Sequence, residues 1–254
     1  MKLAVMGSSG SLAAPTNPAS GYLLSDGTTN LLADIGPGVL GQLQNVCNPA
    51  SAHVVFSHLH PDHCLDFPSL LVWRRYHPTL MATERHICAG PSDTAARLGP
   101  LSGDAPGEVD DMGDTFDLHT WELGGALEIG DFRITPFSAI HPIESYSLRI
   151  AHTSGPVVAY SGDTAYTEEL TKCAQDADLF LCEATWGSKE STMVPDMHLS
   201  GGQAGRIAQQ AGARHLVLIH IPPWADPDEA YTAARAEYSG PIDIATSGME
   251  FQLR

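Results

Sequence analysis

The run at positions 57–63, SHLHPDH, directly follows the apolar segment HVVF and constrains the fold more than any other part of the chain. In an extended chain His58 and His60 point to the same side. Pro61 keeps His60 out of helical geometry and turns the chain. Three imidazoles and one carboxylate thus lie within six residues, and these are the ligands that borderline divalent cations take. The run predicts a metal site at the end of a buried strand rather than a polar loop with chance histidines.

Two cations side by side need more ligands than one loop supplies, so we expect further ligands after other strands. Three polar residues hold such positions: His141 after FRITPFS, Asp163 after VVAY and His220 after LVLI. A single residue of this kind is more often an ordinary loop residue. The same position after several strands, together with the first run, favours a shared metal site.

Short apolar runs separated by Gly and Pro predict a strand-rich α/β chain. The helix at 201–211 has the clearest signals, because Ser200 and Gln203 form a capping box and Gly212 ends it. Stacked sheets covered by helices are expected, in one domain of residues 1–254 with an acidic surface loop near 98–117. The other expected helices are 38–46, 67–76, 91–97, 166–174 and 227–238. The expected strands are 2–7, 20–25, 30–34, 53–57, 79–83, 126–129, 131–137, 145–151, 156–160, 178–182, 215–219, 242–245 and 249–253.

Composition excludes several classes of protein. Hydrophobic residues make up 43% of 254, which excludes a disordered chain. No stretch approaches the length of apolar sequence that a membrane span needs. Thirteen basic residues against 30 acidic ones give a net charge of −17, which disfavours polyanionic partners such as nucleic-acid polymers and anionic membranes. Five scattered cysteines without C-x-x-C indicate reduced thiols in a cytoplasm.

The order of these motifs resembles that of the metallo-β-lactamase fold superfamily of hydrolases: H-x-H-x-D-H, a strand-end His, S-G-D-T, then a late His. The resemblance covers nearly the whole chain and implies a four-layer αββα sandwich. It also implies two divalent cations, with zinc favoured and manganese or iron as alternatives. By this resemblance one ion is held by His58, His60 and His141, the second by Asp62, His63 and His220, and Asp163 bridges them.

Within that superfamily the chain resembles the ribonuclease Z group of phosphodiesterases. The resemblance rests on His198, just before the 201–211 helix, and on the EATW stretch that begins at Glu183. It implies that His198 is a catalytic proton donor, with Glu183 as a supporting partner. Asp34 is expected to hydrogen-bond a histidine of the metal loop or the local backbone.

One departure from the ribonuclease Z pattern concerns the substrate. The tRNA-processing members carry a long basic arm between the third-motif His and the bridging Asp. Here His141 and Asp163 are only 22 positions apart, and the segment between them holds one Arg, Arg149, and no Lys. Together with the acidic charge, this makes tRNA a poor candidate substrate.

The stretch VWRRYHP at 72–78 resembles a branch of actinobacterial cyclic-AMP phosphodiesterases with this fold. Arg74 and Arg75 are therefore expected to hold a phosphate or base near the site. The alternative is that both are charges at a solvated helix end.

We therefore expect a dinuclear metal-dependent phosphodiesterase that hydrolyses a small cyclic nucleotide, with 3′,5′-cyclic AMP favoured. A metal-bound hydroxide attacks phosphorus, Asp62 helps to fix the metal pair, and His198 protonates the leaving oxygen. Three alternatives stay open: an RNA 3′-end endonuclease, a hydrolase of lactones, esters or sulfate esters on the same metals, and a metal-stabilised binding protein. No membrane partner is expected, and a homodimer is common in this fold.

Overall fold

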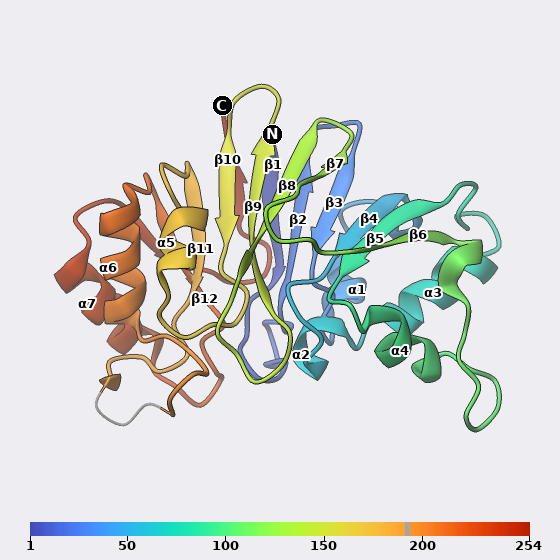
Figure 1. The fold of residues 1–254 in the computed structure, drawn as a ribbon, viewed down its shortest axis with the longest axis horizontal. Helices are drawn as coiled ribbons and strands as arrows, with labels where there is room; N and C mark the ends of the chain where they lie inside the picture. The colour runs from blue at the N-terminus through green and yellow to red at the C-terminus, as the bar shows by residue number, and fades with distance from the viewer. Residues whose placement is uncertain (191–193) are drawn as a thin grey trace.

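The computed structural model describes residues 1–190 and 194–254, which form two seven-stranded sheets packed face to face (Figure 1). The first sheet has the order β14 (Glu250–Gln252), β1 (Lys2–Gly7), β2 (Gly21–Ser25), β3 (Asn30–Ala33), β4 (Ala52–Val55), β5 (His86–Gly90) and β6 (Phe116–Thr120). The second has the order β13 (Ile242–Ile244), β12 (Leu216–Ile219), β11 (Leu179–Glu183), β10 (Val157–Tyr160), β9 (Tyr146–His152), β8 (Phe132–Ser138) and β7 (Leu127–Ile129).

Helices cover the outer face of each sheet, so the chain forms four layers (Figure 1). The first sheet is covered by α1 (Val39–Leu43), α2 (Pro61–Cys64), α3 (Phe67–Tyr76) and α4 (Thr94–Leu98). The second is covered by α5 (Glu168–Cys173), α6 (Gly201–Ala211) and α7 (Pro227–Glu237). Short 3-10 turns lie at η1 (Pro49–Ser51), η2 (Gly99–Leu101) and η3 (Met112–Asp114). The expected αββα sandwich is confirmed.

Three apolar clusters hold these layers together. The central one joins the facing sides of the sheets, and includes Val5 and Leu31 from the first sheet and Leu148 and Val217 from the second. The other two lie between each sheet and its helices. Since apolar burial is the main favourable term in folding, the two inner sheet faces and both helix layers are fixed by it. No helix in the described part of the chain has the length and apolar character needed to cross a membrane.

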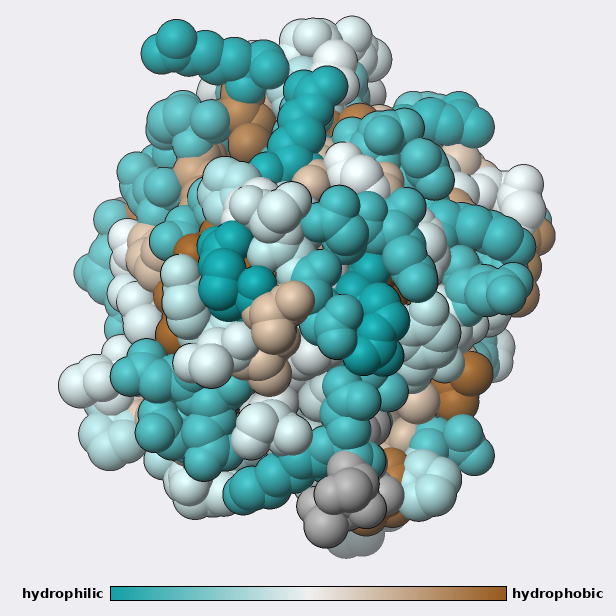
Figure 2. Space-filling view, turned by 90° about the vertical axis from the view of Figure 1, so that its left-hand side faces the viewer, coloured by the Kyte–Doolittle hydropathy of each residue, from teal (hydrophilic) through white to brown (hydrophobic). Residues whose placement is uncertain are grey.

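Helix α6 begins and ends as its sequence predicts. The Ser200 hydroxyl accepts a hydrogen bond from the Gln203 backbone N–H, and the Gln203 side chain accepts one from the Ser200 N–H, both at 3.0 Å. Gly212 follows in the left-handed conformation, with φ of 66°. The apolar face of α6 is buried against the second sheet and α7, while the outer surface on this side is predominantly hydrophilic (Figure 2).

The strand expected at 79–83 is wrong, and two strands of the first sheet, β5 and β6, were missed. Leu80 and Met81 are more than 40% exposed, and the segment pairs with no strand among the described residues. Strand β6 has only one fully buried residue, Phe116, so its sequence lacks the alternation that identifies a strand. The region expected as an acidic loop near 98–117 contains η2, η3 and the start of β6.

Candidate metal centre and active site

Strands from both sheets end at one edge of the sandwich, beside α2 (Figure 1). In the first sheet β3 and β4 are parallel, and in the second β10, β11 and β12 are parallel. Strand β8 shares their direction, because both β8 and β10 are antiparallel to β9. The segments that follow these strands therefore meet. They supply Asp34 after β3, the metal loop after β4, His141 after β8, Asp163 after β10, Glu183 at the end of β11 and His220 after β12.

The first group of ligand atoms comes from His58, His60, His141 and Asp163, and all lie within 4.8 Å of one another. His60 Nδ1 and His141 Nε2 are 2.9 Å apart. His58 Nε2 lies 3.6 Å from Asp163 Oδ2, and His141 Nε2 lies 3.9 Å from the same oxygen. The sequence predicted this group, and the structure brings its four members together.

The second group comes from Asp62, His63, Asp163 and His220, again within 4.8 Å. His220 Nε2 lies 3.1 Å from Asp62 Oδ2 and 3.3 Å from Asp163 Oδ2. His63 Nε2 lies 3.3 Å from Asp163 Oδ1. Asp163 belongs to both groups, which is the position that a bridging carboxylate requires.

The donor atoms fit divalent cations. His58 Nε2, His63 Nε2 and Asp163 Oδ1 are buried and have no hydrogen-bond partner within residues 1–190 and 194–254, although buried polar atoms are normally paired. Burial holds the pKa of His58 well below its usual value, so its imidazole is neutral and able to coordinate. Burial alone would raise the pKa of Asp163, but the neighbouring histidines outweigh it and lower that pKa well below its usual value. His58 thus offers a neutral nitrogen and Asp163 an ionised carboxylate to a cation. His63 differs: burial alone would lower its pKa, but the Asp163 and Asp62 carboxylates outweigh burial and raise that pKa well above its usual value.

Four of the five candidate ligand histidines have a partner for the other ring nitrogen, which orients the ring. His63 Nδ1 lies 2.7 Å from Asp34 Oδ2, and His141 Nδ1 lies 2.8 Å from the Met197 carbonyl. The remaining two contacts are to hydroxyls: His58 Nδ1 with Ser57 Oγ at 3.1 Å and His220 Nδ1 with Thr185 Oγ1 at 2.9 Å.

Asp34 is the centre of one of these supporting networks. The fully buried carboxylate accepts hydrogen bonds from the Ser57 N–H at 2.8 Å, the Ser57 hydroxyl at 2.6 Å and the Tyr160 hydroxyl at 2.5 Å, besides its contact with His63. Its expected hydrogen bond to a metal-loop histidine is therefore present, to His63.

His198 lies beside both groups and pairs with Glu183. Its Nδ1 is 3.0 Å from Glu183 Oε1 and 3.9 Å from Asp163 Oδ2. Burial disfavours the charged imidazole, but the Glu183 carboxylate outweighs it and raises the pKa of His198 to about 9. Backbone N–H groups of Thr164 and Leu199 fix the Glu183 carboxylate at 2.8 and 3.1 Å. The pair is thus suited to hold a proton next to the metal ligands.

The backbone around His220 is tightly constrained. His220 has φ of 55° and Asp34 has φ of 59°, and such values are uncommon outside glycine and cluster at functional sites. The His220 N–H donates to the Ser8 carbonyl at 2.9 Å. A Cβ on Gly10 would lie 2.3 Å from the His220 carbonyl oxygen, so only glycine fits there. The opening loop therefore fixes the backbone of this ligand.

The expected substrate-binding role of Arg74 and Arg75 is wrong. Arg74 is 1% exposed, and its guanidinium donates to the carbonyls of Ala50 and Thr115 at 2.6 and 2.7 Å. Arg75 forms ion pairs with Asp110 at 2.6 Å and with Asp114. Neither lines the pocket over the metal ligands. Arg74 thus connects α3 to Ala50 and Thr115 in the interior. Arg75 connects α3 to the acidic residues Asp110 and Asp114.

Sequence reasoning missed four supporting groups: Ser57, Tyr160, Thr185 and the Met197 carbonyl. Ser57 and Thr185 each lie within two residues of a predicted site residue, so their position was the available signal. Met197 acts through its backbone, which no side-chain pattern reveals.

Comparison with known proteins identifies the family. The model of the Beta-lactamase superfamily domain matches residues 29–221, which is most of the chain. The chain belongs to this superfamily. Among its relatives, the protein Rv1339 of Mycobacterium tuberculosis (strain ATCC 25618 / H37Rv) is 46% identical over 100% of this chain and 93% of its own length. The probable metallo-hydrolase YhfI of Bacillus subtilis is 30% identical over 99% of this chain and 100% of its own.

Solved structures of the superfamily agree. The crystal structure of YhfI superimposes with a TM-score of 0.87 over 98% of each chain. The human tRNase Z, short form, gives a TM-score of 0.74 over 100% of each chain at 20% identity, a likeness of fold. With the His and Asp groups described above, this superfamily member is a metallo-hydrolase.

Proposed function

We propose that this metallo-hydrolase cleaves small phosphodiesters, with 3′,5′-cyclic AMP as the favoured substrate. The observation that carries the proposal is the His198–Glu183 pair next to the two ligand groups, with Nδ1 and Oε1 3.0 Å apart. Opening a cyclic nucleotide expels a ribose alkoxide, which needs a proton as it leaves. A protonated imidazole beside the metal ligands meets that need.

Two zinc ions are the proposed cofactors. His58, His60 and His141 would hold one, Asp62, His63 and His220 the other, and Asp163 both. Imidazole and carboxylate ligands also suit manganese and iron. When bound, such a pair of cations lowers the pKa of a shared water and neutralises charge on phosphoryl oxygens. Asp62 would help to fix the spacing of the pair, because its Oδ2 lies within 3.6 Å of His63 Nε2 and 3.1 Å of His220 Nε2.

His198 is the proposed proton donor. It lines the same pocket as His60, Asp62 and His220, and its contact with Glu183 favours the protonated ring. Because Glu183 engages Nδ1, the donor atom toward the leaving oxygen would be Nε2. Glu183 is itself held by two backbone N–H groups, so the ring is held by a fixed carboxylate.

The pocket over the two ligand groups is small. Its volume is about 180 Å³, below the roughly 300–1,000 Å³ of pockets that enclose drug-sized ligands, so it would hold a phosphodiester group while the base of a cyclic nucleotide lies outside it. No Lys or Arg is among the described residues that line it. The segment between His141 and Asp163 is occupied by β9 and β10, whose one arginine, Arg149, donates to the carbonyls of Cys173 and Gln175. A polyanion would thus meet few free cations here, on a chain of net charge −17.

The free cysteines support a proposed cytoplasmic location.

An RNA 3′-end nuclease is the second candidate, because proteins named ribonuclease Z are among the relatives. The test is an activity panel on metal-loaded protein with cyclic AMP, cyclic GMP, bis(p-nitrophenyl) phosphate, a tRNA precursor and a lactone. We expect turnover of the generic phosphodiester and of a cyclic nucleotide, and little cleavage of the precursor. Efficient, specific removal of a tRNA 3′ trailer at physiological salt would replace the cyclic-nucleotide proposal. Turnover of the lactone alone would replace phosphodiester chemistry, and no turnover at all would favour a metal-stabilised binding protein.

A further inference from the structure

Thr185 lies two residues beyond Glu183 at the end of β11, and its hydroxyl contacts both Glu183 and His220. Thr185 Oγ1 is 2.8 Å from Glu183 Oε2, 2.9 Å from His220 Nδ1 and 3.1 Å from the His220 carbonyl oxygen. All of these contacts are buried. The hydroxyl therefore links a residue of the His198 pair to a residue of the second ligand group.

The direction of these hydrogen bonds follows from the number of hydrogens available. A hydroxyl has one hydrogen and accepts others, whereas an ionised carboxylate only accepts. Glu183 is both the nearest and the charged acceptor, so it takes the hydroxyl hydrogen. His220 Nδ1 must then be the donor to Thr185 Oγ1. A neutral imidazole with its hydrogen on Nδ1 has its lone pair on Nε2, the atom that faces Asp62 and Asp163.

We propose that Thr185 is a positioning residue that holds His220 in the Nδ1–H form and couples this ligand to the Glu183–His198 pair. The ligand part rests on geometry alone, and the coupling part rests on the proposed function. Glu183 Oε1 contacts His198 and Oε2 contacts Thr185, so one carboxylate serves the proton donor and the second ligand group together.

The first ligand group has the same arrangement, which gives a matched comparison. The Ser57 hydroxyl donates to Asp34 Oδ2 at 2.6 Å and contacts His58 Nδ1 at 3.1 Å. Each group thus contains one carboxylate–hydroxyl–imidazole chain. His63 and His141 differ, because their partners are a carboxylate and a carbonyl. These oxygens can only accept a hydrogen bond, so the ring nitrogen must be the donor.

The test compares Thr185→Val, which keeps the shape and removes the hydroxyl, with Thr185→Ser, which keeps the hydroxyl. Zinc affinities are measured on the full chain by competition with a chelator. Loss of an outer partner of a ligand histidine typically weakens metal binding by about 10–100-fold. We expect Thr185→Val to weaken one of two zinc sites by about this factor, and Thr185→Ser to restore it. Ser57→Ala is the comparison variant and should weaken the other site instead.

Three results would overturn the proposal: unchanged affinities in Thr185→Val, equal weakening of both sites, or equal losses in the Val and Ser variants. If Thr185→Val does not fold, ¹⁵N NMR of His220 in the metal-free wild-type protein still decides. The neutral ring should carry its hydrogen on Nδ1, and a hydrogen on Nε2 would contradict the assignment. Neither measurement uses a substrate. If the zinc and NMR results are as expected but the protein does not hydrolyse cyclic AMP, the proposed function and the coupling that rests on it are wrong. The role of Thr185 toward His220 would stand.

Discussion

Replacing Asp34 by asparagine removes the charge at the centre of a buried network and changes almost nothing in shape. Oδ2 of Asp34 accepts from three groups, His63 Nδ1, the Ser57 hydroxyl and the Tyr160 hydroxyl, and Oδ1 accepts from the Ser57 N–H. An asparagine amide must present its NH₂ to one side or the other. Placed toward Oδ2 it faces three donors, so the amide would turn toward the Ser57 N–H instead.

The Ser57 N–H and one N–H of the introduced amide then face each other in the interior, and neither has an acceptor. Each unsatisfied buried group costs about 1–3 kcal/mol, so Asp34→Asn should lower the free energy of unfolding by about 2–6 kcal/mol. For a chain of this size each kcal/mol corresponds to roughly 2–4 °C, so the melting temperature should fall by at least about 4 °C. His63 loses a charged partner, and so does the Ser57 hydroxyl that contacts His58, so zinc affinity should also fall by about 10–100-fold.

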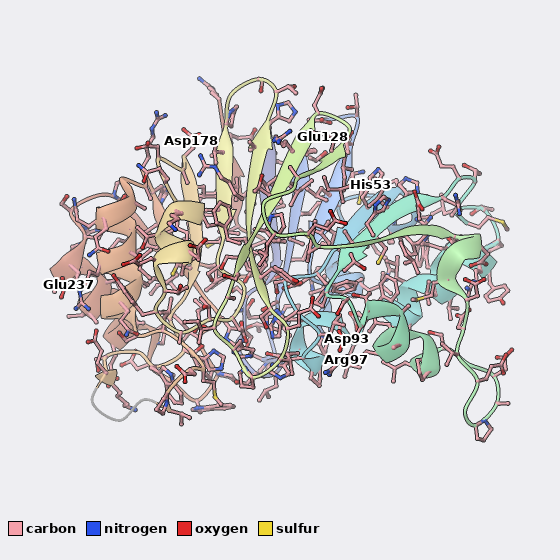
Figure 3. All side chains as sticks on the ribbon, viewed as in Figure 1. His53, Asp93, Arg97, Glu128, Asp178 and Glu237 are labelled. Atoms are coloured by element: carbon pink, nitrogen blue, oxygen red, sulfur yellow. The ribbon has the colours of Figure 1, made fainter. Side chains whose placement is uncertain are left out.

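Calorimetry and chelator competition measure these two effects, and Asp178→Asn is the matched control. Asp178 accepts a hydrogen bond from the Val157 N–H at 2.8 Å and pairs with Arg214. It lies in the upper half of Figure 3, whereas α2 of the metal loop lies at the lower edge of the sheets in Figure 1. The control should lose some stability and keep both zinc affinities. Unchanged melting temperature and zinc binding in Asp34→Asn would refute the reasoning.

Three further changes separate the roles assigned to other residues. His198→Ala should keep both cations while kcat for cyclic AMP falls by about 10²–10⁴. The loss should be smaller with a nitrophenolate leaving group, and equal losses on both substrates would contradict a proton-donor role. His63→Ala should lower elemental zinc content mainly by one ion per chain, and loss of both or neither would contradict two separate groups. Arg75→Ala should leave kcat/KM unchanged and cost about 1–3 kcal/mol of stability, because its two-bond pair with Asp110 is mostly buried. A large rise in KM would restore Arg75 to the substrate site.

The candidate ligand groups were predictable because their side chains carry the chemistry and their positions after strands carry the geometry. Parallel strands end at the same edge of a sheet. The side chains that follow them therefore meet although they are distant in sequence, as do those of His58, Asp163 and His220. The capping box of α6 is equally local. What such patterns do not contain is which hydroxyl or carbonyl supports each ligand, as the missed Thr185 and Met197 show.

The error on Arg74 has a clear physical origin. Two adjacent arginines suggested a shared role, yet neighbours on a helix point about 100° apart. Arg74 lies seven residues after Phe67, on the face that also carries Leu70 and Leu71, and all four are buried. Helical periodicity therefore predicts that Arg74 points toward the protein interior. The adjacent charge of Arg75 is no evidence that the two residues share a role. The wrong strand at 79–83 arose differently, because a strand needs a partner that the local sequence does not specify.

Titration of chelator-stripped protein with zinc, followed by hydrolysis of bis(p-nitrophenyl) phosphate, tests the central claim most directly. The two ligand groups that share Asp163 predict that activity rises until two zinc ions are bound per chain and then levels off. Full activity at one ion per chain, or no hydrolysis at any zinc content, would contradict a two-cation phosphodiesterase.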